Sequence, residues 1–436
     1  MKKIAIVHEW LTSHAGSEKV VEQILNIYPQ ADLFSLVDFL PPSLRHIIHN
    51  KSVHTSFIQK LPFAKRHFRN YLPLMPLAVE QFDLSPYDLI ISSHHAVAKG
   101  ILTRPNQLHI SYVHTPLRYG WELQHQYLRQ AGLTRGLKSA LTRSILHYMR
   151  LWDVASANRV DCYVANSHYV ARRIEKTYRR NATVIYPPVD TQRFHTSPQV
   201  LSPQASSIQA LSLQPSSQGI TQPAHPPLDN PEQEQKQLST QARPRENFYL
   251  TVSRFVPYKR VDLTIRAFNQ LGLPLVVIGD GKAGKALRQL ANDNIRFLGK
   301  QPDSVVEDHM QRCRGFIFPP EEDFGITPVE AQAAGAPVIA YAKGGQAETV
   351  IHQQTGLIFA HQTVESLVQS VNQLERNMDQ FDPYALKKNA EKFSVKRFQT
   401  QFEGFVDKAW KQFQVNIQMN EMSATPIPDI SPRHMT

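Results

Sequence analysis

The stretch Gly315-Phe-Ile-Phe-Pro-Pro-Glu-Glu-Asp-Phe-Gly-Ile-Thr-Pro-Val-Glu330 is the part of this sequence that decides the fold. An apolar run leads into a turn with a carboxylate at either end, Glu322 and Glu330, and small residues follow. This order predicts a buried strand, a tight turn and the start of a helix. Such a turn directs backbone amides and the positive helix end toward an anion, while the carboxylates can accept hydrogen bonds from hydroxyl groups. The pattern therefore predicts a site for a phosphorylated sugar.

Two simpler interpretations of these residues stay open. Thr327 can be the N-cap of the helix, with Pro328 at its first position and Glu330 as the capping-box partner. Glu322 precedes the helix, so the capping box does not explain it, but it can be an ordinary exposed glutamate.

Apolar runs on both sides of this stretch indicate two series of parallel strands. Each run ends in polar or small residues and is followed by a helix-like segment, which is typical of α/β folds. The sequence predicts two Rossmann-like, doubly wound domains that face each other across a cleft, with ligands at the carboxyl ends of the strands. The runs are residues 4–8, 89–94, 109–114 and 162–167 in the first half, and 248–253, 275–279, 295–299, 315–319, 337–341 and 356–359 in the second.

Changes in composition set the predicted domain boundaries. We expect an N-terminal domain over residues 1–195 and a C-terminal domain over residues 247–414, whose last helix can pack back on the first domain. Residues 196–246 are rich in Ser, Gln and Pro and lack aromatic residues, so we expect a disordered linker there. We also expect a disordered tail over residues 415–436.

The overall composition narrows the class of protein. The chain has 436 residues, a net charge of +11 and only two cysteines, Cys162 and Cys313, which form neither a disulfide framework nor a zinc site. We expect a reduced, cytoplasmic setting, with no signal peptide and no membrane span. Despite the basic charge no nucleic-acid-binding motif is present, so no nucleic-acid partner is expected. Basic and aromatic residues gather in segments 61–75 and 129–150, which suit either peripheral contact with the inner face of an anionic membrane or packing on their own domain.

Two cations follow the first strand of the second half. Arg254 and Lys259 are expected at its carboxyl end, where they can neutralise a diphosphate, or they can be part of a basic surface loop. Neither half has two aspartates spaced to hold a divalent metal on a diphosphate. We therefore predict no metal site, with protein cations and helix ends in the place of the metal.

Two further segments have patterns that fit a site. Gly279-Asp-Gly281-Lys-Ala-Gly284 matches a phosphate-approach loop, but it fits a plain tight turn equally well. In the first half, the densest polar and aromatic cluster is Ser111-Tyr-Val-His114-Thr-Pro-Leu-Arg118-Tyr-Gly-Trp121. His114 can contact a sugar hydroxyl or the leaving phosphate, or it can be an ordinary buried histidine.

Taken together, these motifs resemble those of glycosyltransferase family 4, the retaining group with the GT-B fold. The resemblance covers the chain apart from the linker and the tail. It rests most on Arg254 with Lys259, Gly279-Asp-Gly281, the Glu322–Glu330 pair and Gly344-Gly345, which occur in the family's order. Two departures are a first loop that reads Ala15-Gly16, where the family commonly has two glycines, and the long linker.

The resemblance implies roles for individual residues. His114 and Glu322 would be the catalytic positions beside the transferred sugar, and Glu330 would bind the ribose of the donor. Arg118 and Trp121 would contact the sugar or the acceptor. The donor diphosphate would be bound by five positions: Gly16, Arg254, Lys259, Gly325 and Ile326.

The resemblance also implies the reaction. A hexose would move from a nucleotide sugar to a saccharide or lipid-linked acceptor with its configuration retained, with no cofactor and no metal. The segment from His114 to Glu122 resembles bacterial mannosyltransferases that build surface polysaccharides, which favours GDP-mannose as the donor. The alternatives are a UDP-hexose-dependent transferase, a soluble sugar-phosphate synthase and, more distantly, a sugar-nucleotide-binding protein without catalysis.

Overall fold

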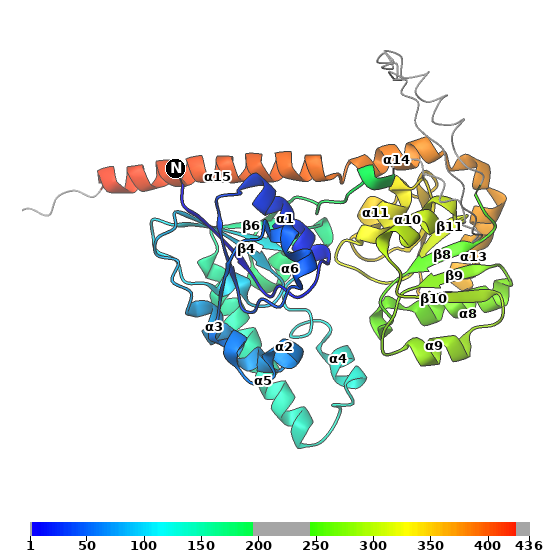
Figure 1. Ribbon diagram of the computed structural model, residues 1–436, viewed down its shortest axis with the longest axis horizontal. Coiled ribbons are helices and arrows are strands. Elements are labelled where there is room, and N and C mark those ends of the chain that lie inside the picture. Colours follow the sequence, from blue (N-terminus) through cyan, green and yellow to red (C-terminus); the bar gives the residue numbers. More distant parts are fainter. Residues whose placement is uncertain (1, 195–244, 424–436) are drawn as a thin grey trace, which may run out of the picture.

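The chain forms two α/β domains, each built on a parallel sheet with helices packed against it (Figure 1). The computed structural model describes residues 2–194 and 245–423. The predicted linker, residues 196–246, lies outside the described residues except for its last two positions.

The first sheet has seven parallel strands in the order β3-β2-β1-β4-β5-β6-β7. The strand order reverses at β1, between β2 and β4, and this is where doubly wound sheets bind ligands. The four predicted strands are present, whereas β2, β3 and β7 contain too few consecutive apolar residues to stand out as apolar runs. The strands are β1 (Ile4–His8), β2 (Asp32–Ser35), β3 (Val53–Thr55), β4 (Leu89–His94), β5 (Leu108–Val113), β6 (Cys162–Ala165) and β7 (Ala182–Val184).

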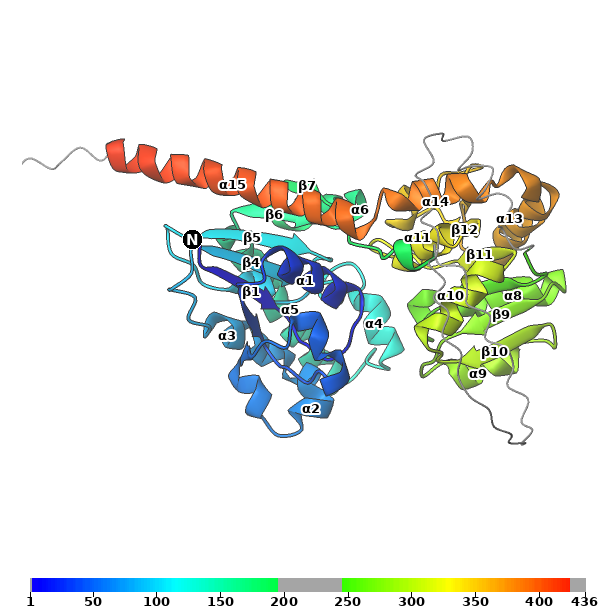
Figure 2. The same cartoon turned by 45° about the horizontal axis from the view of Figure 1, so that its top comes forward.

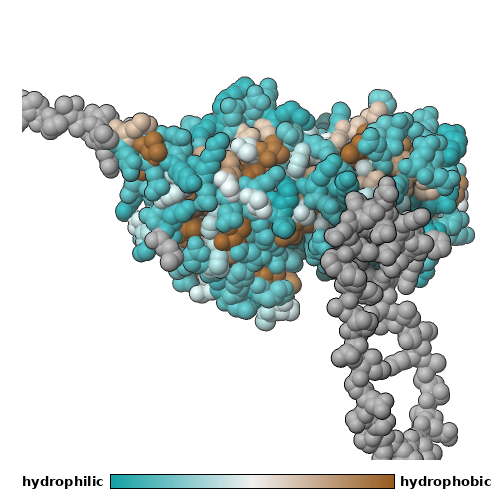
Figure 3. All heavy atoms as spheres, turned by 90° about the horizontal axis from the view of Figure 1, so that it is seen from above, coloured by the Kyte–Doolittle hydropathy of each residue, from teal (hydrophilic) through white to brown (hydrophobic). Residues whose placement is uncertain are grey.

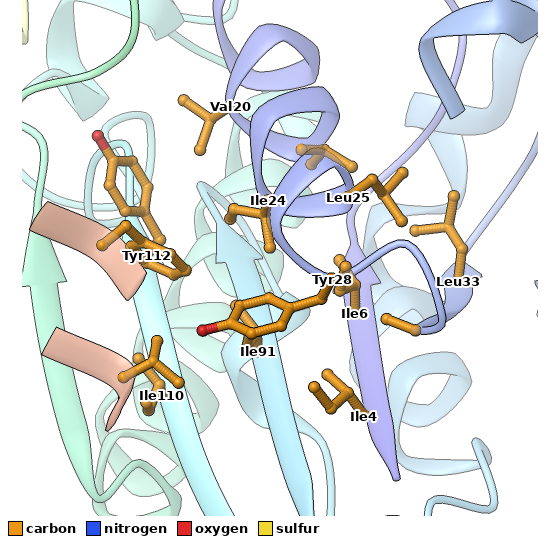
Figure 4. Close-up of a cluster of buried hydrophobic side chains, with 14 of the residues drawn as sticks. Ile4, Ile6, Val20, Ile24, Leu25, Tyr28, Leu33, Ile91, Ile110 and Tyr112 are labelled. Carbon is orange, nitrogen blue, oxygen red and sulfur yellow. The ribbon is translucent and has the colours of Figure 1, made fainter. Parts of the chain in front are cut away.

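One core cluster of the first domain lies between this sheet and α1 (Figure 4). Val20, Ile24 and Leu25 of α1 recur at helical spacing and are fully buried against Ile6 and Ile91 of the sheet. The α-helices of this domain are α1 (Gly16–Ile27), α2 (Ala64–His67), α3 (Met75–Glu80), α4 (Gln124–Gln130), α5 (Leu137–Ser156) and α6 (His168–Tyr178). Short 3₁₀ helices are η1 (Pro42–Ile48), η2 (Phe57–Lys60), η3 (Phe68–Leu74), η4 (Ala98–Gly100), η5 (Ala157–Arg159) and η6 (Gln192–Phe194).

The second sheet has six parallel strands in the order β10-β9-β8-β11-β12-β13, and all six were predicted. They are β8 (Tyr249–Val252), β9 (Leu275–Ile278), β10 (Ile295–Gly299), β11 (Gly315–Phe318), β12 (Val338–Tyr341) and β13 (Gly356–Phe359). The α-helices are α8 (Val261–Leu271), α9 (Gly284–Leu290), α10 (Asp303–Arg312), α11 (Ile326–Ala333), α12 (Gln346–Thr349), α13 (Val364–Arg376), α14 (Pro383–Glu391) and α15 (Val395–Ser423), with 3₁₀ helices η7 (Pro257–Lys259) and η8 (Met378–Gln380).

The last helix, α15, runs from the second domain along the first (Figures 1 and 2). Phe398, Phe402 and Val406 are fully buried in the core of the first domain, and both phenylalanine rings pack against Tyr112 of β5. The chain that leaves the second domain therefore completes the core of the first.

This helix also corrects one prediction. Residues 415–423, assigned to a disordered tail, continue α15 as far as Ser423. Val415 and Met419 are half exposed, so this end of the helix lacks the buried stripe that makes a helix visible in a sequence.

The face of the molecule seen from above is mostly hydrophilic (Figure 3). In Figure 3 its apolar residues form small, separate patches. None of the helices in residues 2–194 and 245–423 is long and apolar enough to cross a membrane.

Candidate functional site

The turn between β11 and α11 forms as predicted. Gly325 has φ 84° and precedes Ile326, the first residue of α11, and no side chain caps the first amides of this helix. Thr327 is therefore inside the helix, and the capping-box interpretation of Thr327 and Glu330 is wrong. The first N–H groups of α11 therefore have no side-chain cap and face the loop that leads from Glu322. Uncapped N–H groups at a helix start favour the binding of an anion.

The loop after β12 holds this turn in place. A Cβ atom on Gly345 would lie 2.3 Å from the carbonyl oxygen of Asp323, so only glycine allows the two backbones to approach so closely. The Gly345 amide donates to the Glu322 carbonyl at 2.8 Å. The buried amide group of Gln346 donates to the carbonyls of Pro320 and Tyr341. The Gly344-Gly345 pair thus serves the geometry of the turn.

Lys259 and Glu322 form an ion pair within the second domain. Lys259 Nζ lies 2.8 Å from Glu322 Oε1, and both side chains are less than one-fifth exposed. Burial alone would lower the pKa of Lys259, but the Glu322 carboxylate outweighs burial and raises it. Glu322 is therefore not an ordinary exposed glutamate. The structure brings this predicted diphosphate cation and the predicted sugar-facing carboxylate together.

Arg254 lies at the carboxyl end of β8 and is exposed. Its charge acts on Arg69 of the first domain, whose pKa is lowered by burial and by this second guanidinium. Within the described ranges, the guanidinium group of Arg254 makes no hydrogen bond or ion pair. Arg254 and Arg69 thus place two guanidinium groups near each other, and the carboxylate of Glu18 also acts on Arg69.

The Gly279–Gly284 loop packs against the loop that carries Arg254. A Cβ atom on Gly279 would lie 1.8 Å from the Ser253 carbonyl oxygen, and one on Gly281 would lie 2.6 Å from that of Phe255. These glycines meet protein backbone, so the tight-turn interpretation accounts for both of them.

Glu330 lies one turn into α11 and is almost fully buried. Its Oε1 atom accepts a hydrogen bond from Arg193 at 3.0 Å and lies 3.4 Å from Lys19 Nζ. Lys19 belongs to α1, so this carboxylate connects the first helix of one domain with the site of the other. The predicted ribose position therefore has two cations as partners, one from each of two segments of the first domain.

Gly16 lies at the boundary between the domains. It is the first residue of α1, and a Cβ atom built on it would lie 3.1 Å from Cδ1 of Ile326. The first loop and the start of α11, which are 310 residues apart, thus meet. The single glycine of Ala15-Gly16 supplies the close approach.

His114 directly follows β5 and belongs to a buried polar chain. Its Nε2 atom lies 2.9 Å from the Ser93 hydroxyl, which lies 3.1 Å from Nδ1 of His8. Burial lowers the pKa of His114 well below its usual range, and the neighbouring histidines lower it further, so the imidazole is neutral near pH 7. The chain continues from His8 to Glu18. Burial would raise the pKa of Glu18, but the His8 imidazole, 3.9 Å away, helps lower it to about 2. A neutral His114 can donate or accept one hydrogen bond on the side away from Ser93.

Arg118 and Trp121 have different surroundings. Arg118 Nη1 lies 3.0 Å from Asp323 Oδ2 across the domain boundary, next to Glu322. The Trp121 indole N–H instead donates to Asp153 at 2.8 Å, in a buried network with Lys99. The structure therefore brings Arg118 to the turn but directs the polar atom of Trp121 away from it, so only the ring of Trp121 could meet a sugar.

Several residues at the domain boundary were not predicted. They are Lys19, Tyr169, Arg173, Arg193, Asp323 and Glu348. Only Asp323 lay within a motif that the sequence singled out. The others have partners more than 130 residues away along the chain, and no local pattern points to such pairs. Within the described ranges, no group of three or more His, Cys, Asp or Glu side chains is placed to hold a metal ion.

Comparison with known families agrees with this geometry. Residues 34–193 match the model described as Glycosyltransferase Family 4, and residues 232–393 match the model described as Glycosyl transferases group 1. Together the two matches cover most of both domains. The chain belongs to glycosyltransferase family 4.

Two curated relatives are similar to this glycosyltransferase over part of their length. An uncharacterized glycosyltransferase of Methanocaldococcus jannaschii is 33% identical over 155 residues, 34% of this chain and 44% of that protein. A GDP-mannose-dependent alpha-(1-6)-phosphatidylinositol monomannoside mannosyltransferase of Mycobacterium tuberculosis is 33% identical over 141 residues, 28% of this chain and 37% of that protein. The aligned part of the chain thus spans less than half of each relative.

A solved structure shows the same fold over nearly the whole glycosyltransferase. Anabaena HepE in complex with UDP and glucose aligns with a TM-score of 0.62 and 18% identity, over 93% of this chain and all of that one. The two parallel sheets described above are the two domains of the GT-B fold. The residues gathered around the turn before α11 lie at the boundary between these domains.

Proposed function

We propose that this protein is a retaining hexosyltransferase that moves a sugar, with mannose favoured, from a nucleotide sugar to a saccharide or lipid-linked acceptor. The observation that carries the proposal is the group around the start of α11. The helix start lies between Glu322, which is paired with Lys259, and Glu330. Cations and helical amides suit a diphosphate, and carboxylates on either side suit the hydroxyls of a sugar and a ribose.

In the proposed reaction, the acceptor hydroxyl attacks the anomeric carbon on the face from which the diphosphate leaves. The bond from that carbon to the diphosphate oxygen breaks, and the departing diphosphate takes the hydroxyl proton. Lys259, Arg254 and the first amides of α11 would stabilise the negative charge that develops on the leaving group. We propose that these groups do so without a metal ion. Neutral His114 would hold a sugar hydroxyl.

The donor proposal rests on the mannosyltransferase-like segment from His114 to Glu122 and on the GDP-mannose-dependent relative. A UDP-hexose donor is the second candidate, because the solved structure of HepE, which has the same fold, contains UDP and glucose.

Donor binding is the experiment that tests this function. Thermal shift is measured with GDP-mannose, UDP-glucose, GDP and UDP, each with and without EDTA, on the wild type and on Arg254→Ala. A ligand at about 100 times its dissociation constant stabilises the protein by roughly 2.7 kcal/mol, which the method resolves. We expect a shift with guanosine ligands that EDTA leaves unchanged and that Arg254→Ala removes. A uridine-selective shift would replace the donor, and no shift with any of the four would contradict the proposal.

We also propose that the protein binds an anionic membrane surface on the cytoplasmic side through α5 and the segment around α2. Leu137, Leu141, Tyr148 and Leu151 recur at helical spacing on α5 and are between 44% and 90% exposed. Phe63, at the start of α2, is 80% exposed and has φ 57°, an unusual conformation for a phenylalanine. In Figure 1, α2 and α5 lie at the end of the first domain opposite α15.

The charge of these segments favours anionic lipid. Residues 57–79 and 124–152 contain no Asp or Glu, whereas Lys65, Arg66, Lys138 and Arg143 accompany the apolar residues. Exposed apolar side chains with only cations around them are typical of helices that lie in a membrane interface.

Vesicle flotation tests this second proposal. We expect co-flotation with vesicles containing phosphatidylglycerol and little with pure phosphatidylcholine. Leu137→Gln together with Leu141→Gln should abolish it, while the matched pair Val415→Gln with Met419→Gln on α15 should not. Equal binding by both pairs of variants would contradict the assignment of this surface.

A further inference from the structure

The start of α6 is capped by a carboxylate of the other domain. Helix α6 follows β6, so its first amides lie at the carboxyl edge of the first sheet. The amides of His168 and Tyr169 both donate to the carboxylate of Glu348, on α12, at 2.8 Å. The N-cap residue Ser167 accepts a hydrogen bond only from Val170 with its side chain. An anionic cap at a helix N-terminus is stabilising, and here it joins the two domains.

Asp323 makes a second set of contacts with the first domain. Its carboxylate pairs with Arg118 at 3.0 Å and, more closely, with Arg173 of α6. Its carbonyl oxygen accepts a hydrogen bond from the Ser167 hydroxyl at 2.6 Å. The side chains of Arg118, Arg173 and Asp323 are all less than one-fifth exposed, so water screens these charges weakly.

The three consecutive acidic residues of the turn point to different domains. Glu321 accepts a hydrogen bond from the Tyr169 hydroxyl, and Asp323 pairs with Arg118 and Arg173, so both are held by the first domain. Glu322, between them, pairs with Lys259 of its own domain. Both neighbours of Glu322 are thus held by the first domain, whereas Glu322 itself is held within the second.

We propose that Ser167, Tyr169, Arg173 and Arg118, with Glu321, Asp323 and Glu348, form an interdomain latch that positions Glu322. When the latch is closed, the turn before α11 is held between Arg118 and Gly345, and Glu322 faces Lys259. When it is open, the two arginines lose their shared carboxylate and the turn loses its contacts with α6. Asp323 is thus a positioning residue, and its effect on the rate rests on the proposed transfer reaction.

The test uses Asp323→Asn and Glu348→Gln in the full chain, with Asp293→Asn, an exposed carboxylate before β10, as the control. Hydrogen exchange is followed at the amides of His168 and Tyr169. We expect Glu348→Gln to raise exchange there directly. Asp323→Asn, which does not touch these amides, should raise it as well, because the latch opens as a unit. The control should leave exchange unchanged.

Kinetics form the second arm of the test. Misplacement of Glu322 by about 1 Å should lower kcat for sugar transfer on the order of 10²-fold in Asp323→Asn. Affinity for the nucleoside diphosphate should stay within about twofold, because Lys259 and Arg254 are untouched. The double variant with Arg173→Gln should be no slower than Asp323→Asn, since the Asp323–Arg173 pair is already lost in the single variant.

The outcomes separate this inference from the proposed function. Unchanged exchange at His168 and Tyr169 in Asp323→Asn would overturn the latch, as would lost nucleotide affinity with unchanged kcat. If Asp323→Asn does not fold, both hydrogen exchange and transfer kinetics are measured on Glu348→Gln instead. If the wild type transfers sugar from none of the donors, the proposed function is refuted. The hydrogen-exchange measurement at His168 and Tyr169 would still test the latch in that case.

Discussion

At the scale of single residues, the site is built from charges whose partners are partly buried. Glu322 has Lys259, Glu330 has Arg193 and Lys19, and Asp323 has Arg118 and Arg173. Removing one member of such a pair leaves the other without compensation in a poorly solvated place, which costs more than the pair contributes. Substitutions here should therefore act on both stability and function.

Lys259→Met tests the central pair. The substitution leaves the Glu322 carboxylate unpaired and removes a cation from the proposed diphosphate site. We expect stability to fall by about 1–3 kcal/mol and the transfer rate to fall on the order of 10²–10³-fold. Urea denaturation and transfer kinetics measure the two effects. Lys285→Met, at an exposed lysine of α9, is the matched control, and equal behaviour of both variants would contradict the assignment of Lys259.

Buried histidines should make the first domain sensitive to acid. Burial lowers the pKa of His109 and of His95 to about 4 in the folded chain, from an ordinary value near 6.5. Between pH 6.5 and 4 the unfolded chain therefore binds protons that the folded chain does not, so stability falls as the pH falls. Each of these histidines should contribute a loss of about 3 kcal/mol over this window.

Urea denaturation at pH 7 and at pH 4.5 measures this loss. In His109→Gln, which cannot titrate, the difference in stability between the two pH values should be smaller than in the wild type. A difference as large as that of the wild type would show that His109 is not the source. Glu18, whose pKa is about 2, keeps its charge through this window and loses it only at lower pH.

At the scale of elements, loops pack on loops. The turn before α11 is held by the loop after β12, and the loop after β8 is held by the loop after β9. In each case a glycine allows two backbones to approach more closely than a Cβ atom would permit. The glycines of these motifs therefore contact protein backbone. Their role is to position the loops that carry the charged residues.

Gly345→Ala tests this role. The added Cβ atom would lie 2.3 Å from the Asp323 carbonyl and 2.5 Å from Cα of Phe324, so the turn must shift. We expect loss of stability of about 1–3 kcal/mol and loss of transfer activity. Thermal unfolding and kinetics provide the measurement.

A second alanine is the control for that substitution. Gly404 lies in α15 with no atom within 4 Å of its added Cβ, so Gly404→Ala should leave activity unchanged and stabilise by about 0.5–1 kcal/mol. Full activity in Gly345→Ala would show that the turn tolerates the shift.

At the scale of the whole molecule, the two domains depend on each other for stability. Helix α15 follows the second domain in the chain, yet Phe398, Phe402 and Val406 are part of the core of the first. Lys2 near the start of the chain pairs with Asp407 on the same helix. The latch adds a second connection across the boundary, between α6 and the turn before α11.

Phe402→Ala tests this dependence. The ring is fully buried against Tyr112 and Phe398, so its removal should cost about 3–5 kcal/mol. We expect the first domain to lose stability although the substitution lies in the chain after the second. Val415→Ala, half exposed on the same helix, should change stability by less than about 0.5 kcal/mol. Denaturation followed by hydrogen exchange in β5 measures the effect.

The sequence by itself was enough for the two sheets, for ten of their strands and for the turn before α11. Apolar runs and turn residues are local signals, and parallel strands buried on both faces give strong ones. It also singled out Glu322, Lys259, Glu330 and Gly16, which the structure places at one boundary. Their roles with a donor stay predictions.

Only the tertiary structure decided which charges pair. Asp323 with Arg173 and Glu348 with the start of α6 join residues 150 or more positions apart. Such contacts carry no local periodicity, because each depends on how two separately folded sheets meet. The sequence could therefore propose a sugar-nucleotide site from its motifs, whereas the latch that holds Glu322 became visible only when the domains were placed against each other.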